Sequence, residues 1–297
     1  MIYSCNMTEL ALTTDYVRST GDPEPFLRKI AAAGFTAVHW CHKWLGEYRY
    51  RDGEVHRIAG LLRQYELKLI DLHAAVGLFS DWSSKNELRR KTGLGQIKNR
   101  IHMTAELGGD AVVLHVPEGR IDAQGVWMTP VRRSLNELER EVRNTGVRIA
   151  LENLPAKGHM ESLLKLCGEY SPEFLGICYD SGHGNLAGNG LELLEQMVKR
   201  DAKEGPGRIA ALHLHDNEGD RDSHLPPFRG TVDWHRLIRI LKTGGYKKPL
   251  CQESSIRHTG EKSEGAFLNK CFKAGERLDS IWKNSGTYEF RMGENGE

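Results

Sequence analysis

Side chains able to bind a metal or move a proton gather in the stretch 178–185, which reads CYDSGHGN. The stretch ends an apolar run, 174–179, and then presents Asp180 and His183 three residues apart. One tight turn at this spacing aims a carboxylate and an imidazole at the same small volume, as two metal ligands or as an acid and a ligand. An Asp-Ser-Gly turn with a helix-capping aspartate and an incidental histidine is the simpler interpretation. The choice between them depends on whether the arrangement recurs.

The arrangement does recur, because other predicted strands also end in potential ligands. The residues at these ends are His73, His115, Glu152, His213 with His215, and Glu253. A carboxylate at the end of a buried strand needs a charged partner, and Glu152, Asp180 and Glu253 repel one another unless a cation lies between them. His213 adds a nitrogen, so the set suits a divalent ion such as Mn, Co, Mg or Zn, with open positions for substrate oxygens. Taken singly, His73 and His115 are equally well explained by hydrogen bonds to nearby backbone.

These residues lie in eight repeated units. Each unit is a predicted β-strand followed by a segment whose apolar residues recur with the period of an α-helix. The strand bodies are almost continuously apolar, which indicates burial on both faces in a parallel sheet with helices outside. Eight units in 297 residues predict an α/β fold, a single (β/α)8 TIM barrel, with its chemistry where the strands end. A doubly wound sheet is less favoured because the first strand-helix turn lacks Gly-x-Gly-x-x-Gly. The predicted strands are 2–7, 35–40, 67–73, 111–115, 147–152, 174–179, 208–214 and 249–252.

The barrel is expected to span residues 1–283, followed by a polar, poorly ordered C-terminal tail at residues 284–297. With 39% hydrophobic and 27% charged residues, the chain has the composition of a soluble globular protein. The formal net charge of +1 creates no overall field for a polyanion, so a nucleic-acid partner is disfavoured without being excluded. No membrane partner is expected, since no apolar run reaches membrane-spanning length.

The six cysteines are scattered without a Cys-x-x-Cys pair, and several lie inside apolar runs. This usage is typical of reduced packing residues in a cytosolic protein. The first residues also lack the basic start and the long apolar region of a signal peptide. A cytoplasmic location is therefore expected.

Four motifs around the strand ends resemble those of the xylose isomerase-like TIM-barrel superfamily. They are Ala-Leu-Glu-Asn at Glu152, Tyr-Asp-Ser-Gly-His at Asp180 and His183, His-Leu-His-Asp-Asn from His213, and Gln-Glu at Glu253. The superfamily includes sugar isomerases and epimerases, inosose and dehydroshikimate dehydratases, and the metal-dependent apurinic-site endonucleases of AP-endonuclease family 2. The resemblance extends from the first strand to the last helix, and its motifs are specific for the superfamily but not for a substrate.

The resemblance implies that Glu152, Asp180, His213 and Glu253 bind one divalent metal ion. The endonuclease branch holds up to three zinc ions, and candidates for the additional ligands are His73, His115, His183, Asp222 and His224. The N-terminus, however, lacks the Gly-Ala-His-Val-Ser type of opening of the endonucleases, and the motifs at Asp180 and His213 depart from the endonuclease patterns. Sugar or polyol chemistry is therefore favoured over phosphodiester cleavage.

The reaction expected from this resemblance is isomerisation or epimerisation of a keto sugar or polyol through an enediolate. Glu152 and Glu253 form the acid/base pair on opposite sides of the substrate, and His183 hydrogen-bonds a substrate oxygen. A dehydratase or lyase acting on a related keto polyol or keto-glycoside is the alternative, through loss of a β-oxygen. Position 158 is glycine where sugar epimerases of the superfamily usually carry a further glutamate, which weighs against a simple ketose 3-epimerase.

Loop residues add expected substrate contacts. His73 and His115 are placed for hydrogen bonds, and Arg257, just past Glu253, can meet a phosphate or a carboxylate. Trp40 can stack on a sugar ring, although core packing or a subunit contact explains it equally well, so a homo-oligomer is left open. The same alternatives apply to Trp44, Phe79, Trp82 and Trp127.

Overall fold

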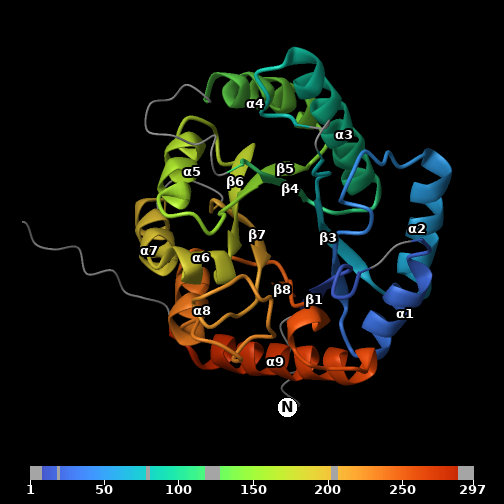
Figure 1. Cartoon of the computed structure of the whole chain (residues 1–297), viewed down its shortest axis with the longest axis vertical. Coiled ribbons are helices and arrows are strands. Elements are labelled where there is room, and N and C mark those ends of the chain that lie inside the picture. Colours follow the sequence, from blue (N-terminus) through green and yellow to red (C-terminus); the bar gives the residue numbers. More distant parts are fainter. Residues whose placement is uncertain (1–8, 19–20, 78–80, 118–127, 202–206, 287–297) are drawn as a thin grey trace, which may run out of the picture.

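Eight parallel strands form a nearly closed barrel in the computed structural model, as the sequence predicts (Figure 1). The structure describes residues 9–18, 21–77, 81–117, 128–201 and 207–286. The strands pair in the order β7-β6-β5-β4-β3-β2-β1-β8. Leu214 closes the ring, because its N–H donates to Cys251 O at 2.9 Å and its carbonyl accepts from Glu253 N at 3.0 Å. The strands are β1 Leu10–Thr13, β2 Ala37–Trp40, β3 Lys68–His73, β4 Ala111–His115, β5 Arg148–Glu152, β6 Leu175–Asp180, β7 Ile209–His213 and β8 Leu250–Gln252.

Helices cover the outside of the barrel, and most of them bury an apolar stripe against the strands (Figure 1). In α8, Leu237 and Leu241 are fully buried, and Asp233 is the N-cap, since its side chain accepts from Arg236 N at 2.9 Å. The helices are α1 Glu24–Ala32, α2 Asp52–Gln64, α3 Glu87–Glu106, α4 Met128–Val142, α5 His159–Cys167, α6 Ser181–Ala187, α7 Gly190–Asp201, α8 Trp234–Thr243 and α9 Glu264–Asn284. A short 3-10 helix, η2 Ile256–His258, lies between β8 and α9. None of the described helices is long and apolar enough to cross a membrane.

Small side chains fill the interior of the barrel below its mouth. Buried clusters apart from the main core consist of Ala111, Val113, Ala150, Cys178, Ala210 and Ala211, and of Ala11, Ala37, Ile70 and Cys251. Residues two apart in a strand point to the same face. Glu152, Asp180, His213 and Glu253 each follow one of these small residues by two positions, so all four side chains face the mouth of the barrel.

The first strand of the described barrel lies later in the chain than the sequence predicts. Residues 2–7 lie outside the described part of the chain, and the strand that completes the barrel is β1. Ala11 in β1 pairs with Ala37 on one side and with Cys251 on the other. The LALT sequence of β1 is only four residues long, so the sequence pattern favours the apolar run at residues 2–7 as the first strand. The other strands differ from the prediction by at most two residues at their ends.

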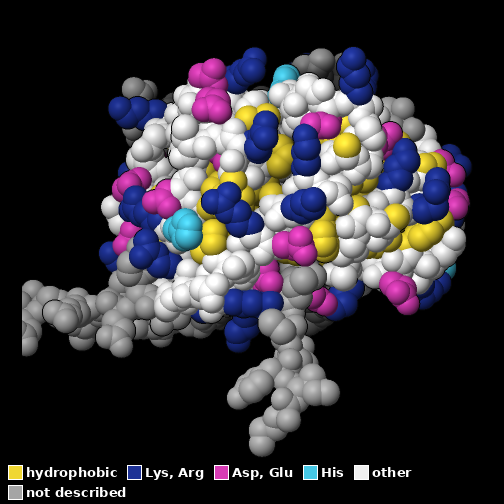
Figure 2. Space-filling model, turned by 90° about the horizontal axis from the view of Figure 1, so that it is seen from below, with side chains coloured by type: hydrophobic (Ala, Val, Ile, Leu, Met, Phe, Trp, Pro, Cys, Tyr) yellow, Lys and Arg dark blue, Asp and Glu magenta, His cyan; other side chains and the backbone are white. Residues whose placement is uncertain are grey.

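The outer surface mixes charges of both signs. Figure 2 looks at the molecule from the side of α9, where Lys and Arg side chains lie between Asp and Glu side chains and scattered hydrophobic ones. This pattern agrees with the formal net charge of +1. The five described cysteines are free and buried, in agreement with their predicted packing role, and Cys5 lies outside the described residues. Helix α9 extends to Asn284, and residues 287–297 of the expected tail also lie outside the described part.

Candidate metal centre

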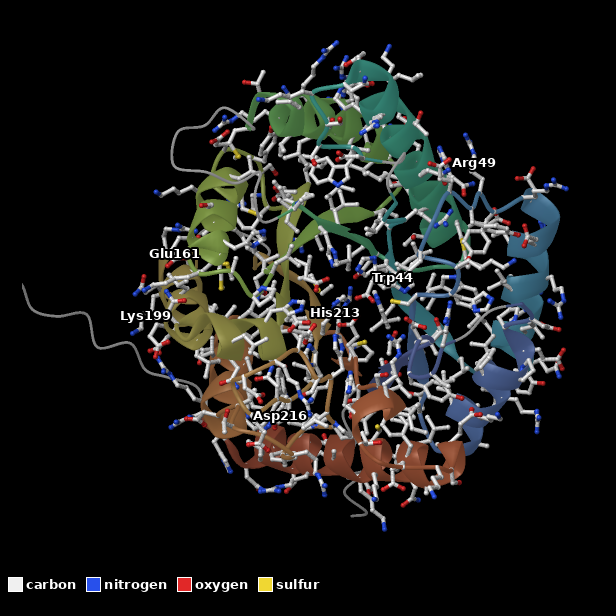
Figure 3. The ribbon with its side chains drawn as sticks, viewed as in Figure 1. Trp44, Arg49, Glu161, Lys199, His213 and Asp216 are labelled. Carbon is white, nitrogen blue, oxygen red and sulfur yellow. The ribbon has the colours of Figure 1, made fainter. Side chains whose placement is uncertain are left out.

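Glu152, Asp180, His213 and Glu253, which the sequence singles out as ligands, converge at the mouth of the barrel. Each offers one ligand atom, and these four atoms all lie within 4.8 Å of one another. The strand register explains the convergence, because Asp180 pairs with His213 across β6 and β7, while Glu152 pairs with Cys178 across β5 and β6. Figure 3 shows His213 inside the ring of helices, whereas Glu161 and Lys199 lie on the outer side.

Glu152 is the centre of this cluster. Its Oε2 lies 3.0 Å from His213 Nδ1, 3.1 Å from His115 Nε2 and 3.6 Å from His73 Nε2, and its Oε1 lies 3.3 Å from His183 Nδ1. Burial opposes ionisation of this carboxyl group, but the imidazoles, His213 foremost, hold the pKa of Glu152 well below its ordinary value. Glu152 is therefore ionised, and its carboxylate lies close to four imidazole rings.

Asp180 caps a helix and also faces the ligand cluster. Its Oδ1 caps α6 by accepting from His183 N at 2.7 Å, and its Oδ2 lies 3.0 Å from His215 Nε2. Asn153 fixes the backbone of Asp180 through two hydrogen bonds, of 2.8 and 2.9 Å. Gly182 is required beside it, because a Cβ at this position would lie 2.0 Å from His215 Cε1. The turn thus holds a carboxylate at the cluster and leaves room for His215.

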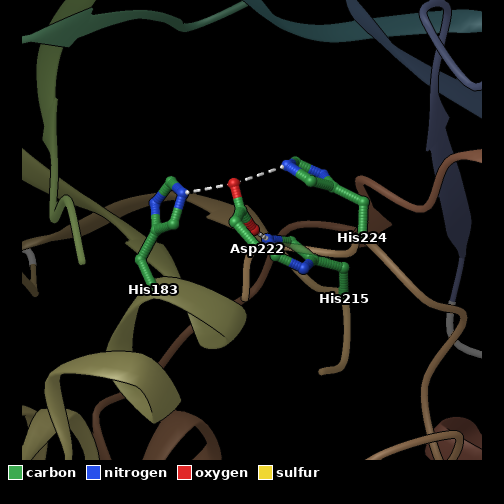
Figure 4. Close-up of side chains that lie close together, drawn as sticks. All are labelled: His183, His215, Asp222 and His224. Carbon is green, nitrogen blue, oxygen red and sulfur yellow. Dashed lines mark hydrogen bonds and ion pairs between the residues drawn. The ribbon is translucent and has the colours of Figure 1, made fainter. Parts of the chain in front are cut away.

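A second group of ligand atoms lies beside the first and consists of His183, His215, Asp222 and His224 (Figure 4). Asp222 Oδ2 lies 3.2 Å from His183 Nε2 and 3.1 Å from His224 Nε2. The ring of His224 stacks on that of His215 with 4.0 Å between centroids. His215 lies with His213 at a strand end that the sequence predicts, but it was assigned to neither of the predicted ligand sets.

A third group joins His73 and His115 to Glu152. The Nδ1–H of His73 donates to Ala74 O at 2.8 Å, so its Nε2 is the nitrogen that faces His115 Nε2, 3.1 Å away. Burial lowers the pKa of His73 to about 4, which keeps the ring neutral, as a metal ligand must be. The three groups share one cavity of about 320 Å³.

The donor set suits a divalent ion. His213 is fully buried, yet neither of its ring nitrogens makes a hydrogen bond of acceptable geometry within the described part of the chain. Buried polar nitrogens normally have a partner, and three carboxylates with an imidazole match the ligands that Mn, Mg, Co or Zn accept. The residues that are present therefore fit the metal that the sequence predicts.

The structure corrects the position of the stacking aromatic residue. Trp40 is only 1% exposed and its Nε1 donates to Tyr50 Oη at 2.9 Å, so it packs in the core and does not contact the cavity. Trp40 follows His39 directly in β2, and neighbouring strand residues point to opposite faces. Trp44 lines the cavity instead, with its ring 4.6 Å from that of His73. Phe79 and Trp127 lie outside the described residues.

Other predicted contacts do reach the cavity. His73, His115, His183 and Arg257 all line it. Thr13 and Asp15 also line the cavity. The prediction missed both residues because it placed the first strand of the barrel too early in the chain. Asp15 Oδ2 accepts from Trp44 Nε1 at 3.0 Å and so fixes the indole in the wall of the cavity.

We expect the metal-free protein to lose thermal stability as the pH rises from 6.5 to 9.5. Asp222 and Glu253 raise the pKa of His224 from 6.5 to about 9, against the effect of burial, so its contribution is complete below pH 6.5 and is lost as the pH passes 9. Burial raises the pKa of Glu253 from 4.5 to about 7, and this shift also makes stability fall as the pH rises.

Thermal unfolding followed by circular dichroism, with a chelator and then with Mn²⁺, measures this dependence. Metal ions bind the deprotonated ligands, so the stabilisation by Mn²⁺ is expected to increase with pH. A melting temperature that stays constant or rises between pH 6.5 and 9.5 in the presence of chelator contradicts the assigned pKa shifts.

The fold and the site together define a class of protein. This class is the parallel (β/α)8 barrel with buried carboxylates and imidazoles at the carboxyl ends of its strands. The chain belongs to the xylose isomerase-like TIM barrel family, which matches residues 27–271. The protein y4fM of Sinorhizobium fredii is 32% identical over 281 residues, which cover 85% of this chain and 87% of that protein.

Two further similarities concern sugar epimerases. The 3-dehydro-D-guloside 4-epimerase of Escherichia coli is 26% identical, and the match covers 58% of this chain and 66% of that protein. A solved structure described as a D-tagatose 3-epimerase-like protein is 25% identical with a TM-score of 0.72, and the match covers 93% of this chain and 97% of that one.

Proposed function

We propose that this protein is a divalent-metal-dependent isomerase or epimerase that acts on a keto sugar or polyol. The observation that carries the proposal is the pair Glu152 and Glu253, two carboxylates that belong to one ligand cluster and line the same cavity. The pKa of Glu152 is held well below its ordinary value, whereas burial raises that of Glu253 to about 7. Such a divergence is typical of a base and an acid that work on one substrate.

The residues of the cavity supply the proton transfers. Glu152, the ionised partner, removes the proton next to the substrate carbonyl, and Glu253, which holds a proton near neutral pH, returns one from the other side. His183, whose Nδ1 is fixed by Asn153 O at 2.9 Å, presents Nε2 to a substrate oxygen. A divalent ion held by Glu152, Asp180, His213 and Glu253 would polarise the substrate oxygens and stabilise the enediolate charge. The similarity to two sugar epimerases supports this assignment.

Proton exchange with solvent tests the proposal. The Mn²⁺-loaded protein is incubated in D₂O with a panel of keto sugars, inososes and 3-keto-glycosides, and the recovered sugars are examined by NMR and mass spectrometry. We expect at least one compound to gain deuterium on the carbon next to its carbonyl group. Loss of water or of an aglycone from the same compound would instead identify the dehydratase or lyase form of the reaction. Absence of exchange across the panel, with cleavage of abasic DNA, contradicts the proposal.

An apurinic-site endonuclease is retained as the second candidate because the cavity contains three ligand groups rather than one. His73 and His115 flank Glu152 on one side, and Asp222 with His224 lies on the other side of the central cluster. Such a ligand set suits the three zinc ions that this reaction requires. Metal analysis separates the candidates, since about one tightly bound ion per chain supports sugar chemistry and about three support the phosphodiesterase.

A further inference from the structure

A row of buried polar groups crosses the barrel interior below the candidate metal centre. Lys248, just before β8, places Nζ 3.3 Å from Asp71 Oδ2, and Asp71 Oδ1 lies 2.6 Å from His39 Nδ1. The side chains of Asp71 and His39 are completely buried. His39 and Asp71 are register partners of β2 and β3, at a point where the register shifts after Val38. Such irregularities are common next to active sites, where they redirect a side chain.

The charge of Asp71 is already paired with that of Lys248, without a contribution from His39. Lys248 Nζ also donates to Ala210 O at 2.8 Å and pairs with Asp110. Although burial opposes its ionisation, Lys248 and then His39 lower the pKa of Asp71 to about 2. A buried ion pair is on average no more stabilising than apolar side chains of the same volume. The imidazole at position 39 satisfies the buried Asp71 Oδ1, but this role uses only one of its two ring nitrogens.

His39 points from this row toward the metal centre. Its ring centroid lies 4.5 Å from that of His213 with 65° between the ring planes, and His39, His213 and Glu253 each place a ligand atom within 4.8 Å of the others. A carboxylate only accepts, so the Nδ1 of His39 carries the hydrogen that it donates to Asp71. Its Nε2 is then an acceptor, and this buried atom has no hydrogen-bond partner among the described residues.

His213 needs an acceptor of this kind. Its Nδ1 faces the carboxylates, 3.0 Å from Glu152 Oε2 and 3.3 Å from Glu253 Oε2, which leaves Nε2 directed away from them. A histidine that binds a metal usually donates its other ring N–H to a neighbouring acceptor, which fixes the orientation of the ring. Among the described residues no nitrogen or oxygen atom forms such a hydrogen bond with His213, and the His39 ring meets the His213 ring edge-on. Cys178 Sγ also lies close, but a thiol is a weak acceptor.

We propose that His39, oriented by Asp71, is the positioning residue for the metal ligand His213. The inference rests on the proposed function, because it requires that His213 binds a metal. His39 does not line the cavity, so it acts on the ligand and not on the substrate. Asp71 fixes the His39 ring, and His39 in turn holds the His213 ring at the angle that presents Nδ1 to the ion.

The test compares His39→Phe with His42→Phe, a matched change at a buried histidine that hydrogen-bonds Gly21 O at 2.8 Å and belongs to none of the ligand groups found among the described residues. Affinity for Mn²⁺ is measured by calorimetry, and the visible spectrum of bound Co²⁺ reports ligand geometry. We expect roughly 10- to 100-fold weaker Mn²⁺ binding and a changed Co²⁺ spectrum in His39→Phe only. His39→Gln, which keeps one donor and one acceptor, is expected to recover part of the affinity.

Wild-type affinity and an unchanged Co²⁺ spectrum in His39→Phe would overturn the inference. If circular dichroism shows that this variant does not fold, Asp71→Asn decides the question, since it leaves His39 in place and changes the group that orients it, together with the partner of Lys248. Several-fold weaker Mn²⁺ binding in Asp71→Asn is the expected result, and unchanged binding overturns the inference. A wild-type protein that binds neither Mn²⁺ nor Co²⁺ contradicts the proposed function as well, so the two failures are distinguishable.

Discussion

Replacing Glu152 by glutamine is expected to reduce turnover by roughly 10³-fold or more and to remove most of the bound metal. The substitution keeps the shape of the side chain but removes the negative charge that lies within 3.6 Å of His73, His115, His183 and His213. It eliminates the proposed base and a metal ligand in one step, so no other single change to the cavity has a larger predicted effect. Steady-state kinetics and elemental analysis of the purified variant measure the two losses.

Glu169→Gln is the matched control for this variant. Glu169 forms a pair with Arg132 at 2.6 Å on the surface, where the loss of one charge has little energetic effect. Its metal content and turnover are expected to equal those of the wild type. If Glu152→Gln retains its metal and more than about a tenth of its activity, Glu152 has neither of the proposed roles.

The second large effect is expected from Glu253→Gln, which should reduce product formation by roughly 10²- to 10⁴-fold. Glu253 lies 3.3 Å from His213 Nδ1 and 3.8 Å from His224 Nδ1, at the edge of the cluster, so its removal disturbs fewer partners than the loss of Glu152. If the two glutamates work on opposite sides of the substrate, the variant still exchanges the proton that faces Glu152.

The two epimers of the substrate distinguish this arrangement from a common loss of activity. In D₂O, Glu253→Gln is expected to exchange deuterium into the epimer whose proton faces Glu152, without converting it into product. The other epimer is expected to remain unlabelled. Equal exchange into both epimers, or normal conversion, contradicts the assignment of Glu152 and Glu253 to opposite faces.

The barrel and the convergence of four polar side chains at its mouth were predictable because both depend on local regularities. Short, almost continuously apolar strands that alternate with amphipathic helices predict a parallel sheet with helices on its outside. The carboxyl ends of such strands meet at one face, so polar residues at those ends must converge. Glu152, Asp180 and His213 illustrate this, since each closes its strand at the residue where the apolar run stops.

The remaining features depend on which face of a strand each side chain occupies, and on register between strands. Trp40 and His39 are neighbours in β2, so their side chains point to opposite faces of the strand. Because His39 points into the barrel and contacts His213, Trp40 packs in the core outside it. The pairing of His39 with Asp71 requires the register shift after Val38, which no property of either strand alone predicts. Thr13 and Asp15 were missed because the first strand was placed too early in the chain.

Anomalous diffraction from a crystal grown with Mn²⁺ tests the central claim most directly. We predict one strong manganese peak among Glu152, Asp180, His213 and Glu253, within about 2.0–2.5 Å of their ligand atoms. Additional peaks beside His73 and His115 and beside Asp222 and His224 would favour the second candidate function. A crystal without a peak among the four central ligands, grown at an Mn²⁺ concentration that supports turnover, would contradict the assignment of this cluster as the metal centre.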